Sequence, residues 1–467
     1  MQCSWRFRDS ERGGAVKEVT LTNFRCFRGQ QRARLAPLTL LLGENSTGKT
    51  SFLALVRALW DTAYFQQVPD FKEAPYDLGS FDEIAHYRGG RGGRAPTFTA
   101  GFVAAPDVVR RQPRRRASGG DALHFEVTFV RKGTVPVPSK WLFEWEAVAI
   151  EDCVLPNGSR DIRFRTTNGR WQWHIPRDLG ARLSPRDRSP LALFSFSWLL
   201  ENLELEPLAG SPPFSAEDKE QLERLSSETD FGSRFLEGPR PFASAPVRSK
   251  PRRTYDPSRP GRDPEGETIP MYLSTAFFED RKSWNALKDA LERFGKDAGL
   301  FDEISVKPLG KRGSEPFQMH VRKFGRSAKG PLRNLIDVGY GVSQVLPVIT
   351  ELFRDESTPM FLLQQPEVHL HPSAQAALGS LFCQIAGRRR QLVVETHSDH
   401  LLDRVRMDVR DGKTKLTPKD VSILFFEREN LDVRIHPLNL DGEGNVLDAP
   451  PTYRRFFLDE TRRSLRL

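Results

Sequence analysis

Hydrophobic and polar positions change their period along the first third of the chain. Apolar residues alternate with polar ones over residues 19–27, and an unbroken apolar run follows at residues 38–42. A glycine-rich turn then leads into residues 52–59, where apolar residues recur at the spacing of one helix face. The pattern predicts strands, a turn and a helix, in that order.

Strand-like runs dominate the stretch that follows. They lie at residues 123–130, 141–150, 162–165 and 170–175. Apolar and polar residues alternate in them, which is typical of strands with one buried face. We expect these runs to form an antiparallel sheet.

The last 220 or so residues show a different order of patterns. Helix-period segments are predicted at residues 281–296, 342–353 and 373–385, and buried strands at residues 360–363, 392–395 and 421–426. Alternation of strand and helix is typical of a parallel sheet covered by helices on both faces. Between this region and the first lie residues 184–244, which are rich in Pro, Ser and Glu and contain one helical piece at 216–225. We interpret them as an inserted arm or linker.

Composition places the chain among soluble globular proteins. Its 467 residues are 38% hydrophobic and 28% charged. No stretch approaches the ~18 apolar residues of a membrane span, and residues 1–15 contain no apolar signal region. The four cysteines are far apart and form no zinc or disulfide pattern. We therefore expect a cytoplasmic protein.

Positive charge is concentrated in one segment. The formal net charge is +9, and the stretch Arg88–Arg116 holds eight arginines against one acidic residue, Asp107. Because glycine and proline interrupt it, the segment is predicted to be a flexible loop that could lie along the phosphates of DNA. A solvated loop with no partner is the alternative. The arginines are Arg88, Arg91, Arg94, Arg110, Arg111, Arg114, Arg115 and Arg116.

The turn after residues 38–42 has the sequence G-x-x-x-x-G-K-T, from Gly43 to Thr50. In such a loop the backbone N–H groups face a phosphate, the lysine reaches the β- and γ-phosphates, and the hydroxyl binds Mg²⁺. A buried strand precedes the loop and an amphipathic helix follows it, as the motif requires. We therefore predict binding of ATP and Mg²⁺. The expected ligands are Gly43, Asn45, Ser46, Thr47, Gly48, Lys49, Thr50 and Ser51.

Polar side chains follow two of the predicted buried strands. Gln364, Gln365 and Glu367 end the first, and Glu395 and His397 end the second. Because ligands bind at the carboxyl ends of strands in an open parallel sheet, these residues should converge on the phosphate loop.

A His-x-His pair, His369 and His371, follows the first of these strands and could indicate a metal site. A metal site is disfavoured, because no third ligand lies at the usual spacing. An ordinary capping or core position would explain any one of the histidines alone, but not His369, His371 and His397 together at strand ends.

Five segments together resemble the ABC-type ATPases of the SMC/RecF/OLD group, and they occur in that group's order. Within the group the chain looks most like stand-alone ATPases of antiphage and mobile-element systems, such as the ATPase subunits of Septu and PARIS. The segments are Val19–Phe27, Gly43–Thr50, Asp337–Gln344, Gln365–Pro372 and Glu395–Ser398.

The resemblance implies an α/β fold like an ABC or SMC head. Its main sheet would be mainly parallel with helices on both faces, and it would carry an antiparallel β subdomain and a helical insertion. Residues 1–183 would be the N-terminal half of the head, 184–244 the inserted arm, and 245–467 the C-terminal half.

The resemblance also implies a head-to-head dimer around two ATP molecules. Gly341 and Ser343 would contact the γ-phosphate bound by the other subunit, although the segment is not Leu-Ser-Gly-Gly-Gln as in transporters. His397 matches the switch histidine, and Arg25 matches an arginine that approaches the nucleotide. Residues 77–83 occupy the Q-loop region without a glutamine, which leaves that contact open.

One departure from the family affects the chemistry. Gln364 and Gln365 stand where the family commonly has two acids, and an amide can orient water but cannot accept its proton. We expect slow hydrolysis, with Gln364 and Thr50 near Mg²⁺ and Gln365 orienting water. Glu395 is the preferred base, and Glu367 is the alternative.

Three functions fit these observations. The first is a DNA-associated ATPase that gates a partner effector such as a nuclease, in antiphage defence or DNA maintenance. The second is a nucleotide-dependent scaffold or sensor that barely hydrolyses ATP, which the two glutamines favour. The third is the nucleotide-binding subunit of a membrane transporter or a small-molecule kinase. It is disfavoured because the Leu-Ser-Gly-Gly-Gln sequence of transporters is missing and because the chain contains a long β-rich insertion. We expect no intrinsic nuclease domain, because only about forty residues follow the last predicted strand, and they are predicted to form turns and a terminal helix at residues 453–467.

Overall fold

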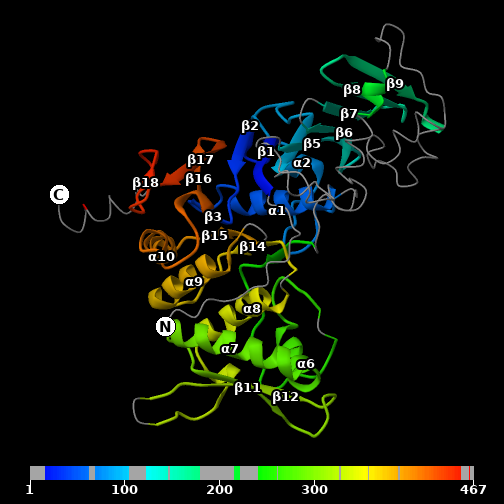
Figure 1. Cartoon of the computed structure of the whole chain (residues 1–467). Helices are drawn as coiled ribbons and strands as arrows, with labels where there is room; N and C mark the ends of the chain where they lie inside the picture. Colours follow the sequence, from blue (N-terminus) through cyan, green and yellow to red (C-terminus); the bar gives the residue numbers. More distant parts are fainter. Residues whose placement is uncertain are drawn as a thin grey trace.

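A computed structural model describes most of the chain. The described residues are 16–62, 69–104, 122–145, 148–178, 215–220, 240–259, 261–325, 328–355, 357–387, 390–453 and 462. They form three sheets and two groups of helices (Figure 1). Among these residues, no helix combines the length and the apolar character needed to cross a bilayer.

The central sheet has seven strands in the order β10-β14-β15-β3-β16-β17-β18. The first five are mutually parallel, and the last two pair antiparallel at one edge. Consequently the phosphate loop after β3 and the polar residues after β14 and β15 leave the sheet on the same side. The strands are β10 Phe242–Ser244, β14 Met360–Gln364, β15 Gln391–Glu395, β3 Leu38–Gly43, β16 Val421–Glu429, β17 Asp432–Leu440 and β18 Val446–Leu447.

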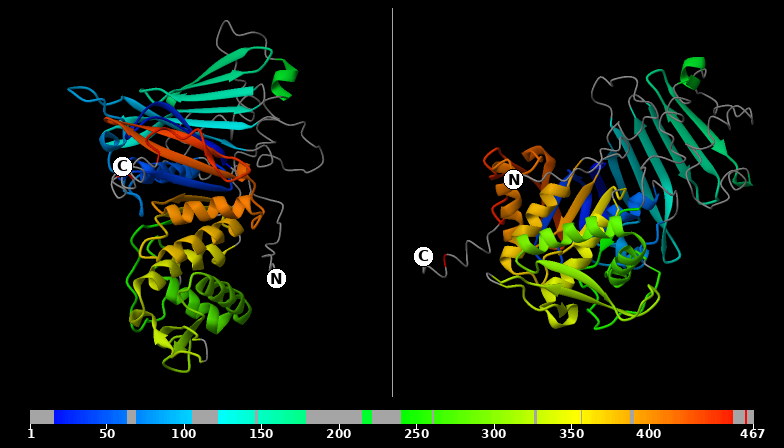
Figure 2. Two further views of the ribbon diagram at one scale, coloured as in Figure 1. Left: turned by 90° about the vertical axis from the view of Figure 1, so that its left-hand side faces the viewer. Right: turned by 60° about the horizontal axis from the view of Figure 1, so that its bottom comes forward.

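An eight-stranded antiparallel sheet covers one face of the central sheet, and its last strands extend beyond it (Figures 1 and 2). The extension is held by aromatic residues that alternate along the strands, such as Trp141, Phe164 and Trp173, each at most 1% exposed. The strands, in sheet order, are β2 Phe27–Arg34, β1 Val16–Phe24, β4 Thr97–Ala104, β5 Leu123–Lys132, β6 Val135–Trp145, β7 Val148–Val154, β8 Arg160–Arg165 and β9 Arg170–Ile175.

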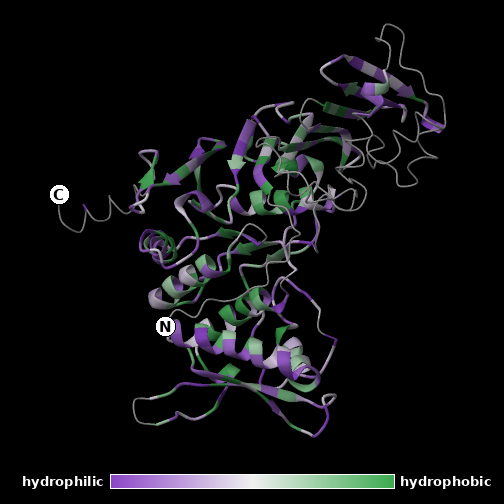
Figure 3. Ribbon diagram, in the orientation of Figure 1, coloured by the Kyte–Doolittle hydropathy of each residue, from purple (hydrophilic) through white to green (hydrophobic). Residues whose placement is uncertain are grey.

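Helices cover the other face, and a small third sheet lies beyond them (Figure 2, left). Hydrophobic and hydrophilic positions alternate along α7 in Figure 3, as expected of a helix with one face in a core. The helices on this face are α6 Ile269–Glu279, α7 Arg281–Asp297, α8 Tyr340–Arg354, α9 Pro372–Ile385 and α10 Asp399–Arg410. Two further helices, α1 Lys49–Trp60 and α2 Phe81–Ile84, lie on the side of the antiparallel sheet. The third sheet comprises β11 Glu303–Pro308, β12 Phe317–Arg322 and β13 Arg333–Asn334.

Successive residues of the central strands enter two separate hydrophobic cores. Leu41, Leu362 and Val393 pack with α1 and the antiparallel sheet. Leu40 and Val394 pack with α7–α10 on the opposite face. Burial on both faces explains why these strands are uninterrupted apolar runs in the sequence.

The alternation of strand and helix in the last third correctly predicted a parallel arrangement. The expectation of a mainly parallel fold is not confirmed, because most strands in the described part of the chain are antiparallel. Helices do lie on both faces, but α1 shares its face with the antiparallel sheet. An apolar face of the central sheet can be buried by helices or by a second sheet. The sequences of the central strands do not show which of the two covers them.

Several elements escaped the sequence patterns. β4 lies inside the segment expected to be a basic loop, and its buried residues Phe98, Ala100 and Phe102 alternate as a strand requires. The predicted strand 141–150 is two strands, β6 and β7, which form a hairpin. β17 follows the last predicted strand, where turns were expected. Helices α6 and α10 were also missed.

The inserted arm falls mainly outside the described residues. Within it, residues 216–220 are helical, in agreement with the start of the predicted piece at 216–225. The rest of that piece is outside the described residues, and so is nearly all of the terminal helix expected at 453–467.

Candidate nucleotide-binding site

The loop between β3 and α1 has a shape that its glycines make possible. Gly43 and Gly48 adopt φ angles of 141° and 85°, which side chains rarely tolerate. A Cβ on Gly43 would lie 2.5 Å from the carbonyl oxygen of Phe426, and one on Gly48 would lie 2.5 Å from Cys26 Sγ. The loop is therefore closed in by β16 on one side and by the β1–β2 turn on the other.

Lys49, at the start of α1, bends back into the loop. Its Nζ donates to the carbonyl oxygens of Gly43, at 3.0 Å, and Glu44, at 2.6 Å. Burial lowers the pKa of Lys49, and the negative charge of Glu395 opposes that shift. Thr47 donates to Glu44 O at 2.8 Å and so braces the same turn. The ammonium is thus held at the inner side of the loop, where a phosphate would lie.

The phosphate loop directly contacts the end of β15. Thr50 Oγ1 donates to Glu395 Oε2 at 2.8 Å, and Glu395 is only 5% exposed. The Gln364 side chain also hydrogen-bonds Glu395, because these two residues are register partners in neighbouring parallel strands. Burial raises the pKa of Glu395, although Thr50, Lys49 and Gln364 favour its charged form.

The two glutamines at the end of β14, Gln364 within the strand and Gln365 directly after it, differ in their environments. Gln364 is 3% exposed, and its Oε1 has no hydrogen-bond partner among the described residues. Gln365 has a φ of 40°, and its backbone N–H donates to Glu395 O at 2.8 Å. The turn after β14 is thereby tied to the end of β15.

Glu367 holds the loop that carries His397. Its Oε1 accepts hydrogen bonds from Thr396 Oγ1, at 2.7 Å, and from His397 N, at 2.8 Å. Burial raises the pKa of Glu367. The His397 side chain is exposed, while loss of hydration and the charge of Lys49 lower its pKa. Of the two carboxylates, Glu395 contacts the phosphate loop and Glu367 supports the neighbouring loop.

The sequence patterns missed Arg248, which is 3% exposed behind these loops. Its Nη2 donates to Gln364 O at 3.1 Å and to Gln365 O at 3.3 Å. Its backbone exchanges hydrogen bonds with the side-chain amide of Gln344 on α8. No motif surrounds Arg248, so only its position in the fold reveals it.

The segment expected to act as the signature lies at the start of α8. Ser343 Oγ donates to Tyr340 O at 2.9 Å, and a Cβ on Gly341 would lie 2.9 Å from His369 O. This segment therefore rests against the loop after β14. Among the described residues, no hydrogen bond or ion pair joins residues 339–344 to the phosphate loop of the same chain.

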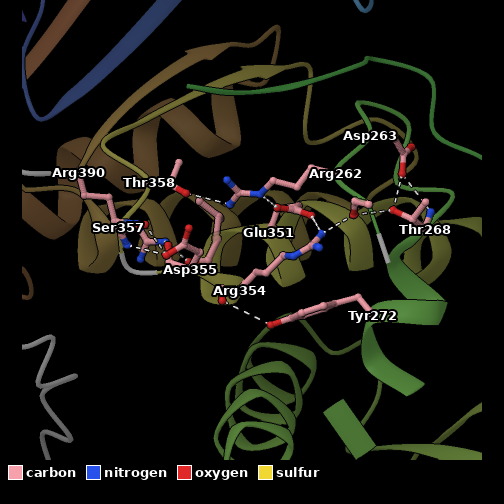
Figure 4. Close-up of polar contacts among 12 residues, drawn as sticks. Arg262, Asp263, Thr268, Tyr272, Glu351, Arg354, Asp355, Ser357, Thr358 and Arg390 are labelled. Atoms are coloured by element: carbon pink, nitrogen blue, oxygen red, sulfur yellow. Dashed lines mark hydrogen bonds and ion pairs between the residues drawn. The ribbon is translucent and has the colours of Figure 1, made fainter. Parts of the chain in front are cut away.

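The opposite end of α8 is held by a buried ion-pair network (Figure 4). Glu351, 1% exposed, accepts from Arg262 Nε at 2.9 Å and from Arg354 Nη1 at 2.7 Å. Arg262 also donates to Thr358 Oγ1 at 2.8 Å, and Arg354 lies over the ring of Tyr272. The helix is consequently tied to α6 and to the start of β14.

The β1–β2 turn and the β16–β17 hairpin flank the phosphate loop. Arg25 lies in the turn with a φ of 48°, and its backbone N–H donates to Ile84 O. Burial raises the pKa of the neighbouring Cys26 thiol to about 11. From the other side, Arg428 donates to the carbonyl oxygen of Ser46. Arg25 was expected near the nucleotide, whereas Arg428 was not.

Asn45 and Ser46 are exposed at the tip of the loop, and Ser51 follows Thr50 in the first turn of α1. The Q-loop region is used locally, because Ser80 and Glu83 form the capping box of α2. Its polar groups therefore stabilise a helix end.

The His-x-His pair has an ordinary structural place. His371 caps α9 by accepting the N–H of Ser373 through Nδ1, and His369 is exposed with a φ of 65°. The described part of the chain brings together one group of potential metal ligands, Glu427, Glu429 and His436, in the β16–β17 hairpin. The pair is not part of that group.

Only part of the basic segment is described. Residues 87–94 form a tight turn in which Arg88 N donates to Gly93 O, and Arg94 donates to Ala85 O at 2.8 Å. β4 follows, so the expectation of one flexible loop from Arg88 to Arg116 is wrong. The cluster Arg110, Arg111, Arg114, Arg115 and Arg116 lies outside the described residues.

Comparison with protein families gives one match. The profile described as "AAA domain, putative AbiEii toxin, Type IV TA system" matches residues 204–403. This range includes α8, β14, β15 and the His397 loop, and it leaves out the phosphate loop. The match to an AAA domain and the G-x-x-x-x-G-K-T loop both point to nucleotide binding.

No curated protein matches this chain in sequence. Among solved structures, it is similar to the SMC head domain from Thermotoga maritima, with 12% identity and a TM-score of 0.37 over 91% of this chain and 98% of that one. It is also similar to the Smc head domain of Pyrococcus yayanosii with a coiled coil and joint, with 9% identity and a TM-score of 0.42 over 96% and 100%. At these values the likeness carries no argument about the site.

Proposed function

We propose that the protein binds ATP with Mg²⁺ and hydrolyses it slowly. The observation that carries this proposal is the hydrogen bond between Thr50, in the phosphate loop, and Glu395, at the end of β15. It supports the proposal because a carboxylate then lies against the phosphate loop, although β14 ends in two amides. The carboxylate that ATPases of the resembling group commonly have at the end of β14 would then be supplied by Glu395 at the end of β15.

The residues at this point fit a magnesium ion. Mg²⁺ prefers oxygen ligands, and it commonly keeps several waters while contacting one or two protein groups and the phosphates. Thr50 supplies a hydroxyl, Glu395 a carboxylate, and Gln364 a buried carbonyl oxygen that has no hydrogen-bond partner among the described residues. A bound ion would neutralise charge on the phosphates. Its proximity would also favour the ionised form of Glu395.

The reaction requires a group that accepts a proton from the attacking water. Glu395 is ionisable and lies next to Lys49, so it can accept that proton near the γ-phosphate. Gln365 can orient the water but not deprotonate it. His397 would contact the γ-phosphate, because its loop follows β15, its side chain is exposed and the charge of Lys49 lowers its pKa.

A second subunit would complete the site. The start of α8 rests on the loop after β14, and among the described residues it makes no hydrogen bond to its own phosphate loop. Gly341 is partly exposed there, whereas the Ser343 side chain is 6% exposed and would have to turn outward to meet a nucleotide on another copy. Tyr340 and Ile336 beside them are 55% and 41% exposed, which a docked copy would cover. Closure of a homodimer around ATP would then signal to a partner protein.

The partner would be an effector such as a nuclease, in antiphage defence or DNA maintenance. The description of the matching family refers to a type IV toxin–antitoxin system, which is consistent in kind with a protein that acts through a partner.

DNA could bind through the basic residues 88–116. In that case the affinity for DNA should fall by about 0.9 log units per log unit of salt for each phosphate contact. Changing the five arginines at 110–116 to Ser should reduce this dependence of affinity on salt. A wild-type protein that binds no DNA at low salt would remove this part of the proposal.

A non-hydrolysing scaffold or sensor is the second candidate. The two amides at Gln364 and Gln365 favour it, since neither can act as a base. In this case ATP would still close the dimer, but phosphate release would be absent.

The direct test compares wild type with Lys49→Ala by isothermal titration and phosphate release. A charge-assisted contact to phosphate is worth about 1.5–3 kcal/mol, so ATP affinity should fall about 10- to 100-fold. Lys413→Ala is a matched control, because Lys413 is exposed and pairs with Asp411. Equal ATP affinity in wild type and Lys49→Ala would remove the phosphate-loop proposal.

A further inference from the structure

Arg248 is buried where the start of α8 meets the end of β14, but its guanidinium group is only partly paired. Nη2 donates to the carbonyl oxygens of Gln364 and Gln365, whereas Nε and Nη1 have no hydrogen-bond partner among the described residues. Burial lowers the pKa of Arg248 to about 10, and the charge of Glu367 opposes that shift.

Glu367 shows the complementary deficiency. One carboxylate oxygen holds Thr396 and the backbone of His397, while Oε2 is buried and has no partner among the described residues. Arg248 donates to Gln365 O, two residues before Glu367, yet in the described part of the chain no ion pair joins the two side chains. Two opposite charges therefore lie near one another with their hydrogen-bonding capacity partly unused.

Stability does not explain this arrangement. A buried charge with unmade hydrogen bonds costs free energy, and an apolar residue of similar size is often neutral or stabilising in its place. The other end of α8 differs, since both oxygens of Glu351 are paired with arginines there (Figure 4). A buried group without a partner calls for an explanation, and a functional role is one such explanation.

A continuous chain of contacts passes through Arg248. Gln344 on α8 bonds the backbone of Arg248, Arg248 bonds the backbone after β14, and Glu367 in the same turn bonds the His397 loop. Arg253 adds a second link, because it forms an ion pair with Asp337 just before α8. The start of α8 is thus joined to the His397 loop through the segment around Arg248 and the turn after β14.

We propose that Arg248 is a positioning residue that couples the start of α8 to the His397 loop by completing its pairing with Glu367 when the ATP-bound dimer closes. The proposal rests on the proposed function. It adds a route between the surface that would meet the second subunit and the group that would meet the γ-phosphate. The two states required of a coupling element are the pair unmade, as in this structure, and the pair made.

The test replaces Arg248 by Met, which fills similar space without charge, and by Lys, which keeps the charge. We expect Arg248→Met to lower kcat about 10-fold, to change KM for ATP less than about 3-fold, and to leave Tm unchanged or raised. Arg248→Lys should recover part of kcat. ATP-dependent self-association, followed by sedimentation velocity, should weaken in Arg248→Met and serves as the second readout if turnover is slow.

Arg390→Met is the matched control. Arg390 is 7% exposed and also donates to two backbone carbonyls, of Leu352 and Asp355, but at the opposite end of α8 (Figure 4). Its replacement should leave kcat within about 2-fold of wild type, because the carbonyl groups that it holds lie at the end of α8 away from the turn after β14. If Arg390→Met lowers kcat as strongly as Arg248→Met does, loss of kcat reports general damage and the coupling role is overturned.

A double-mutant cycle with Gln344→Leu tests the route itself. If Arg248 acts through Gln344, the double variant should lose little more kcat than Arg248→Met alone. Additive losses would contradict the route. Unchanged kcat and association in Arg248→Met, with an active wild type, would overturn the coupling alone. A wild type that neither hydrolyses nor self-associates with ATP would overturn the proposed function and the coupling together.

Discussion

The ends of β14 and β15 are neighbours in the same parallel sheet, yet they differ in chemistry. β14 ends in two amides, Gln364 and Gln365, and β15 ends in a carboxylate, Glu395. Gln364 and Glu395 are register partners and share a hydrogen bond, so the two strand ends form one polar surface beside the phosphate loop. A carboxylate can therefore move by one strand and still reach the same point in space. Sequence position is a poor guide to such a group, because the sheet brings residues about 30 apart into contact.

The largest expected effect separates the two buried carboxylates. Glu395→Gln removes the proposed base, and general-base catalysis contributes about 10²–10⁴-fold, so we expect phosphate release to fall about 100-fold with ATP affinity retained. Glu367→Gln is the control, since the Gln side chain keeps an acceptor for Thr396 and His397. If Glu367→Gln loses as much phosphate release as Glu395→Gln or more, Glu395 is not the base.

A smaller effect is expected at the start of α8. Ser343→Arg places a long charged side chain at a position that is 6% exposed, so it would displace the surface where a second subunit would dock. ATP-dependent association should then be lost, and turnover should fall about 10-fold. Light scattering with a slowly hydrolysed ATP analogue measures the association. The trans-site model is contradicted if the variant assembles and turns over as wild type does.

The smallest effect concerns stability without nucleotide. The pKa of Glu395 is raised in the folded state, so its contribution to stability is present below the pKa of about 4.3 of an unfolded glutamate and is lost as pH rises through the folded pKa. Glu395→Gln does not titrate there. The Tm of Glu395→Gln relative to wild type should therefore increase from pH 4 to pH 8. A difference that is independent of pH would show that the pKa of Glu395 is not raised by burial.

The sequence predicted the parallel strands and the loop after β3 because their patterns are local. An unbroken apolar run such as Leu38–Gly43 has few alternatives to a strand buried on both faces, and G-x-x-x-x-G-K-T has one known use. β4 was missed because the arginines on both sides concealed a short alternating pattern. The sequence did not predict that the antiparallel sheet covers one face of the central sheet. Local patterns do not show which elements of a fold pack against each other.

The site could be predicted only where a motif marks it. Glu395 and His397 were found because they end an apolar strand, and the structure places Glu395 against Thr50. The role of either residue stays a prediction. Arg248 and Arg428 were not found, because each reaches the site from a segment without a motif and through contacts with backbone carbonyls. Such contacts depend on the fold and not on the identity of the partner residue.

The most direct test of the account identifies the nucleotide that remains bound. Wild type and Glu395→Gln are incubated with ATP and Mg²⁺, the dimer is isolated by gel filtration, and its nucleotide is extracted and separated by chromatography. If Glu395 is the base, Glu395→Gln should retain ATP in a stable dimer, whereas wild type should contain mostly ADP. ADP recovered from Glu395→Gln as readily as from wild type would contradict the account. ATP retained unchanged by wild type would favour the non-hydrolysing scaffold.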